Sequence, residues 1–138
     1  MKHSVMLTIA SLLSILLFML HLTDDIVRGM EPGGLSNFIG GVLISVVWLY
    51  GTLVLAERPS GYIILLILSL LGLAIPVIHM KGTGVGVASG IANSSGGFFF
   101  VWTLIALGVT TLFSVILSAR GLWSLQWGKS RLVRQPEL

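Results

Sequence analysis

Four long apolar stretches alternate with short polar segments along this chain of 138 residues. They cover approximately residues 4–22, 38–56, 61–80 and 97–118. Each is close to the ~20 residues that a helix needs to cross the hydrocarbon core of a bilayer, and charged residues are almost absent within them. The pattern predicts an all-α fold, a four-helix transmembrane bundle in which residues 1–138 form a single integral membrane domain and residues 119–138 form a basic interfacial tail.

The polar segments predict where the helices begin and end. We expect the first helix to continue past the membrane surface through Asp24–Arg28 and to stop at Gly29. Its apolar stretch has no small-x-small cleavage pattern after it, so we expect it to be retained as a span rather than removed as a signal peptide. Pro59 cannot continue the second helix, and Pro76 is expected to kink the third.

Composition excludes several classes of protein. Hydrophobic residues make up 55% of the chain and charged residues 9%, whereas soluble domains carry about 25% charged residues. The four spans leave no room for a globular catalytic domain, and we expect a protein that is not an enzyme and needs no cofactor. The absence of cysteine excludes disulfides, thiolate nucleophiles and cysteine-ligated metals.

The distribution of basic residues predicts the orientation in the membrane. With the N-terminus inside, six basic residues face the inner side and two, Arg28 and Lys81, face the outer side. The six are Lys2, Arg58, Arg120, Lys129, Arg131 and Arg134. The positive-inside rule therefore predicts a multi-pass protein of the cell membrane with both termini in the cytoplasm.

Small residues within the spans indicate how the helices pack, because apolar contact alone does not hold helices together in lipid. The second span offers Gly41 and Ser45, and the third offers Ser69 and Gly72. The fourth span has a stripe of small residues at four-residue spacing: Ala106, Thr110, Ser114 and Ser118. We interpret these positions as internal helix contacts, with docking of a partner protein as the alternative for the stripe. Other buried Ser and Thr residues are expected to bond backbone carbonyls or neighbouring helices.

The tail after the fourth span carries aromatic and basic residues that suit a membrane surface. Trp123 and Trp127 are four residues apart and would share one face of a helix. Lys129, Arg131 and Arg134 follow them. This pattern predicts anchoring in the interface and contact with anionic lipid headgroups, and the position of the charge beside the membrane argues against nucleic acid as the partner.

One polar cluster carries most of the chemistry in the sequence. His21, Asp24, Asp25 and Arg28 fall on one face of a helix, and His21/Asp25 and Asp24/Arg28 are each four residues apart. With both termini inside, His79 ends the third span at the same outer surface. His21, Asp24, Asp25 and His79 are thus candidate ligands for a divalent cation such as zinc, or a relay for protons. The alternative is that they mark the water boundary, as we expect for the solvated His3.

Three hypotheses for the function follow. The first is a non-enzymatic accessory subunit of a larger membrane complex, or a protein that forms a homo-oligomer. The second is a membrane protein that binds a metal or small ligand at His21, Asp24, Asp25 and His79. The third is a small-solute transporter, against which the lack of a charged residue near mid-membrane argues.

Overall fold

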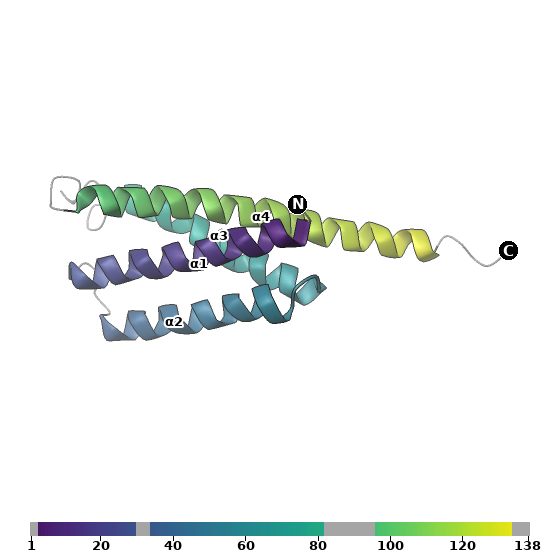
Figure 1. The fold of residues 1–138 in the computed structure, drawn as a ribbon, viewed down its shortest axis with the longest axis horizontal. Helices are drawn as coiled ribbons and strands as arrows, with labels where there is room; N and C mark the ends of the chain where they lie inside the picture. Colours follow the sequence, from purple (N-terminus) through teal and green to yellow (C-terminus); the bar gives the residue numbers. More distant parts are fainter. Residues whose placement is uncertain (1–2, 30–33, 82–95, 134–138) are drawn as a thin grey trace.

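The computed structural model describes residues 3–29, 34–81 and 96–133, with the backbone alone for residues 80–81 and 127–133. It contains four α-helices (Figure 1): α1 (His3–Val27), α2 (Leu35–Leu49), α3 (Pro59–Lys81) and α4 (Gly97–Val133). A short π-helix, η1 (Tyr50–Val54), continues α2. The all-α prediction is confirmed, and all four helices are long and apolar enough to cross a membrane when η1 is counted with α2.

Helix boundaries follow the expected signals at several points. The first helix ends at Val27, and Gly29 has a positive φ of 69°, a conformation that glycine adopts without strain. The third helix begins at Pro59 and continues through Pro76 to Lys81. The fourth helix is longer than its apolar stretch: its 37 residues reach about 55 Å at 1.5 Å per residue, so the described part of the tail continues the helix.

The four helices alternate in direction and lie side by side (Figure 1). α4 packs along both α1 and α3, while α2 packs against α1 and, through η1, against the start of α3. The ends of α1 and α3 lie together at one end of the bundle, which we call the histidine end. The start of α1, the turn between η1 and α3, and the middle of α4 lie at the opposite end, which we call the N-terminal end.

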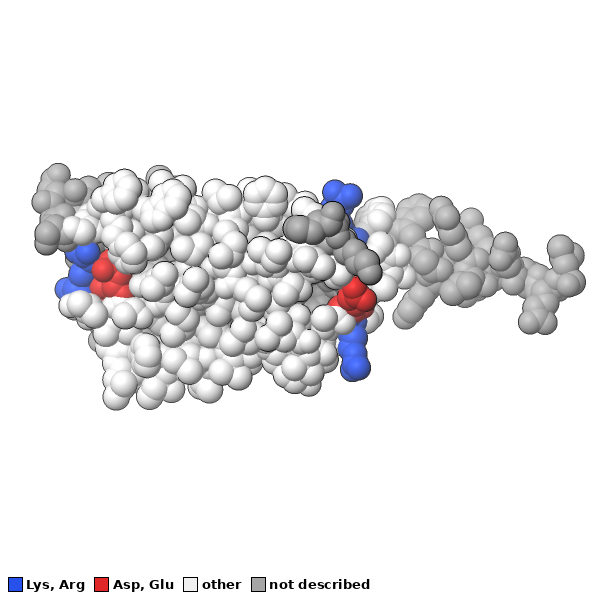
Figure 2. Space-filling view, in the orientation of Figure 1, with Lys and Arg blue, Asp and Glu red and all other residues white. Residues whose placement is uncertain are grey.

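The outside of the bundle is apolar between its two ends. Leu16, Ile39, Leu71 and Phe113 are among many large hydrophobic side chains with more than half of their surface exposed. Figure 2 shows acidic and basic side chains at the two ends of the bundle and none between them on the face in view. A surface of this kind suits contact with lipid and is not that of a soluble monomer.

The predicted packing positions of α2 and α3 lie inside the bundle. Gly41, Ser45, Ser69 and Gly72 are all buried. A Cβ atom added at Gly72 would lie 2.9 Å from Cγ2 of Thr111 and 3.2 Å from Cη2 of Trp48. Only glycine permits α2, α3 and α4 to approach one another so closely at this level.

The buried face of α4 differs in part from the predicted stripe. Ser114 and Ser118 have no exposed surface, but Ala106 and Thr110 are half-buried. Thr103, Leu107 and Thr111 take the inner positions instead. A four-residue spacing advances 400° around a helix, so such a stripe drifts by 40° at each step and leaves the buried face.

The interfacial positions of the tail are described only in part. The side chain of Trp123 is 64% exposed, as a lipid-facing anchor requires. The side chains of Trp127, Lys129 and Arg131, and the whole of Arg134, lie outside the described residues. Anchoring by those four residues stays a prediction.

Candidate metal centre

Three of the four predicted ligands come together at the histidine end of the bundle. The Nε2 atoms of His21 and His79 lie 3.3 Å apart. Oδ2 of Asp25 lies 3.4 Å from Nε2 of His21 and 3.2 Å from Nε2 of His79. One atom from each residue thus forms a nearly equilateral triangle that joins α1 to α3.

The local helix geometry explains why the two α1 residues act together. His21 and Asp25 are four residues apart, and the 100° turn per residue places them one above the other on the same face. That face points into the bundle, where each residue retains only 2% of its surface exposed. His79 reaches the same point from the end of α3, and its side chain is 13% exposed.

A backbone hydrogen bond sets the proton position on His79. Its Nδ1 atom lies 2.9 Å from the carbonyl oxygen of Ile75, four residues earlier on α3. A carbonyl oxygen only accepts, so Nδ1–H must donate. The Nε2 atom of a neutral His79 therefore carries a lone pair, and this lone pair faces the triangle. Metal-binding histidines commonly hold their second nitrogen in this way.

Apolar packing surrounds the two imidazole rings. Phe100, at the start of α4, has no exposed surface, and its ring centroid lies 5.2 Å from that of His21 and 6.0 Å from that of His79. The two imidazole centroids are 4.6 Å apart in an edge-on arrangement. Phe100 therefore covers the site from the α4 side and limits the access of water.

Asp24 does not join the cluster. Its Oδ2 atom accepts a hydrogen bond of 2.8 Å from Nε of Arg28, one turn later on α1. The guanidinium group also lies close to the start of α4, since a Cβ added at Gly96 would be 2.6 Å from Nη2 of Arg28. The nearest basic residue along the chain is thus paired with Asp24 rather than with the buried Asp25.

Asp25 is a buried carboxylate that contacts two imidazoles. Among the described residues, its Oδ1 atom is buried and has no hydrogen-bond partner. A carboxylate in apolar surroundings costs much free energy unless a cation or several donors compensate it. The cluster therefore favours a positively charged occupant.

The remaining histidine lies at the opposite end of the bundle. His3 was expected to be solvated, but its Nε2 atom is buried and its ring centroid is 6.5 Å from that of Tyr62. Together with Glu57, Arg120 and Ser124 it borders an open hollow of about 490 Å³. Local sequence patterns do not predict this hollow, because its residues come from α1, the turn between η1 and α3, α3 and α4.

Comparison of the chain with protein families, with curated protein sequences and with solved structures found no match.

Proposed function

We propose that this four-helix membrane protein binds one divalent transition-metal ion at His21, Asp25 and His79, with zinc as the best match. The observation that carries the proposal is the triangle of donor atoms, with edges of 3.2, 3.3 and 3.4 Å. Donor atoms at normal bond lengths from a tetrahedral Zn²⁺ lie about 3.3–3.5 Å apart. The three atoms thus have the spacing of one face of a zinc tetrahedron.

The spacing and the donor types also discriminate among metals. Neighbouring donors around an octahedral ion at a similar radius would be only about 3.0 Å apart, which fits the triangle less well. Two imidazoles and one carboxylate suit zinc and its transition-metal neighbours, whereas Mg²⁺ and Ca²⁺ prefer oxygen ligands. Oδ1 of Asp25 is available as a further donor beside Oδ2.

A proton is the competing occupant of the cluster. The lone pair of His79 Nε2 faces Oδ2 of Asp25 at 3.2 Å, and two acceptors at that distance repel each other unless something positive lies between them. A proton bound to one imidazole nitrogen can form a hydrogen bond with only one of the other two donor atoms. A metal ion interacts with all three donors at once, and it also compensates the buried carboxylate of Asp25.

The proposal concerns binding and assigns no catalytic step. Metal binding at this site is compatible with an accessory role in a larger membrane assembly or with self-association. The distribution of basic residues supports a position of this site on the outer side of the cell membrane.

Metal analysis of the purified protein tests the proposal. We expect one zinc ion per chain in protein prepared without chelator, and restoration of that content when chelator-treated protein is dialysed against zinc. His21→Ala and His79→Ala should each abolish stoichiometric binding. His3→Ala is the matched control, because His3 lies at the opposite end of the bundle. Wild-type protein that binds no zinc, cobalt or nickel would contradict the proposal.

A further inference from the structure

The interior of the bundle contains a row of polar side chains that the metal site does not use. Six of them have at most a trace of exposed surface: Ser11, Ser14, Ser69, Thr111, Ser114 and Ser118. Trp48, which is 1% exposed, adds an indole N–H. The outside of the same helices is apolar over this length, so the polar groups gather where lipid cannot reach them.

Contacts between the helices give the order of these groups along the bundle. Tyr62 on α3 lies beside Gly121, and Gly72 lies beside Thr111 and Trp48. Because α3 and α4 are antiparallel, Ser69 falls near the level of Ser114, between these two contacts. The hydroxyls therefore succeed one another from Ser118, near the N-terminal end, through the Ser114 and Ser69 level to Thr111 and Trp48.

The row continues from there toward the histidine end. Ser14 lies one turn beyond Ser11 on α1, at the level of Trp48, and Ser45 lies one turn beyond Trp48 on α2. Thr103 lies two turns beyond Thr111 on α4 and three residues from the site-covering Phe100. Successive groups on one helix are three or four residues apart, except across Leu107. This spacing corresponds to about 4.5–6 Å along the helix axis.

Several of these groups have no hydrogen-bond partner among the described residues. They are the hydroxyls of Ser45, Ser69, Ser114 and Ser118 and the Nε1 atom of Trp48. In contrast, Ser14, Thr103 and Thr111 donate to carbonyl oxygens of their own helices. A buried Trp Nε1–H is a donor on a rigid ring, and such a group normally has a partner. The groups without partners are therefore placed to bind internal water.

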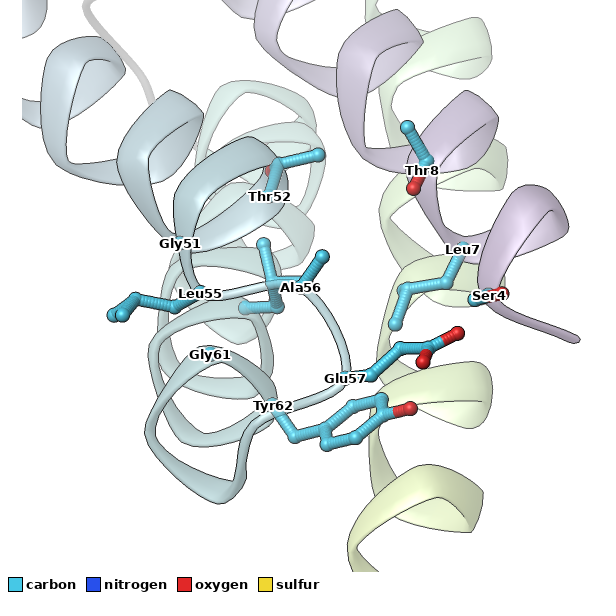
Figure 3. Close-up of a pocket in the computed structure, with 11 residues that line it drawn as sticks. Ser4, Leu7, Thr8, Gly51, Thr52, Leu55, Ala56, Glu57, Gly61 and Tyr62 are labelled. Carbon is cyan, nitrogen blue, oxygen red and sulfur yellow. The ribbon is translucent and has the colours of Figure 1, made fainter.

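The N-terminal end has room for water beside Thr52, the hydrogen-bond partner of Ser11. A cavity of about 10 Å³ lies between α1, η1 and α3, bordered by Thr8, Thr52 and Tyr62 among others (Figure 3). This is about the volume that one water molecule needs. Glu57 and Tyr62 also border the larger open hollow of about 490 Å³, so the small cavity adjoins this hollow.

We propose that a file of water molecules and buried hydroxyls conducts protons along the bundle from this hollow toward the histidine end. One bridging water joins two polar groups about 5.5 Å apart through two hydrogen bonds, which matches the axial spacing of the row except for the step of about 12 Å from Thr111 to Thr103, past Leu107. Each step passes a proton from one water or hydroxyl to the next and breaks no other bond. One positive charge crosses the bundle per proton, so the flux needs a membrane potential or a counter-ion. The path does not depend on a bound metal.

Proton flux into vesicles tests this proposal. The full chain is reconstituted in proteoliposomes that contain a pH-sensitive dye, with chelator present, and a potassium gradient with valinomycin sets a negative internal potential. We expect acidification faster than in protein-free vesicles. The double variant Ser69→Ala/Ser114→Ala should reduce the flux about tenfold, the change expected when a hydrogen bond is lost at the barrier. Trp48→Phe, which keeps the ring but removes the donor, should also reduce it.

Thr110→Ala is the matched control, because the Thr110 hydroxyl is half-buried on the same helix and bonds its own backbone at Ala106. It should leave the flux unchanged. Wild-type protein that is helical and monodisperse but gives the flux of empty vesicles would overturn the proposal. Full flux in both the double variant and Trp48→Phe would overturn it as well. Zinc content is measured separately, so failure of the metal proposal and failure of this one are distinguishable.

Discussion

Nε2 of His79 lies 3.2 Å from Oδ2 of Asp25, although the two residues are 54 positions apart in the chain. The contact joins the ends of α1 and α3 at a point from which water is largely excluded. It also brings a lone pair toward a carboxylate, because Nδ1 of His79 donates to Ile75. This arrangement is the physical basis for a positively charged occupant.

Loss of the Asp25 charge should weaken zinc binding more than loss of any other carboxylate in the chain. Asp25→Asn keeps the shape of the side chain but removes the negative charge that faces both imidazoles. We expect zinc affinity, measured by competition with a chromophoric chelator, to decrease by about 100-fold or more, in keeping with the loss of a charged ligand.

Asp24→Asn is the control for that measurement. Asp24 is the neighbouring residue, and its carboxylate pairs with Arg28 at 2.8 Å outside the triangle. Zinc affinity should stay within about threefold of wild type, because Asp24 supplies none of the three donor atoms and its charge is already paired with Arg28. Equal losses in the two variants would count against the three-residue site.

Zinc should stabilise the folded protein by mass action. A ligand that binds only the native state at 100 times its dissociation constant adds about 2.7 kcal/mol to the free energy of unfolding. We expect a higher midpoint of thermal unfolding in detergent when zinc is added, and no shift for His21→Ala. His3→Ala should retain the shift, and a shift of equal size in His21→Ala would show that zinc acts elsewhere on the protein.

The sequence predicted the fold well because the hydrophobic pattern alone determines which segments can lie in lipid. The four apolar helices, the end of α1 before Gly29 and the turn before Pro59 all follow from the residue types in short stretches of the sequence. His21 and Asp25 were also predictable as a pair, since their four-residue spacing is a property of a single helix.

Other parts of the site depend on contacts between helices, which local patterns do not specify. His79 reaches the cluster only because α3 lies beside α1 in this packing. The sequence does not predict a role for Phe100, because an aromatic residue at the start of an apolar helix is common. Its position over two imidazoles depends on how α4 packs against α1 and α3. Asp24 shares a helix face with His21 and Asp25, which makes it a candidate ligand in the sequence, but in the structure it pairs with Arg28.

Gly72 should be intolerant of a side chain. Gly72→Ala places a Cβ atom 2.9 Å from Thr111 and 3.2 Å from Trp48, closer than van der Waals contact allows. We expect the free energy of unfolding to decrease by about 1–3 kcal/mol, the usual cost of overpacking. Gly40→Ala is the matched control, because a Cβ at Gly40 has no neighbour within 4 Å. Denaturation in mixed micelles measures both, and a Gly72→Ala variant as stable as Gly40→Ala would contradict the packing.

Ser11 and Thr52 should be energetically coupled across the α1–α2 interface. Thr52 donates to the carbonyl oxygen of Trp48 at 2.8 Å, so Ser11 donates to the Thr52 oxygen at 2.7 Å. A double-mutant cycle with Ser11→Ala and Thr52→Ala should give a coupling free energy of about 0.6 kcal/mol, the mean for hydrogen bonds between membrane helices. A coupling indistinguishable from zero would mean that this bond does not hold α1 and α2 together.

The orientation inferred from basic residues can be tested with single cysteines, because the natural chain has none. Val27 is 80% exposed at the histidine end, and Arg58 is exposed in the turn at the N-terminal end. If both termini are cytoplasmic, a membrane-impermeant maleimide added to intact cells should label Val27→Cys and not Arg58→Cys. Both should react after the membrane is permeabilised, which controls for accessibility. Labelling of Arg58→Cys alone in intact cells would show the opposite orientation, with the His21, Asp25 and His79 cluster on the cytoplasmic side.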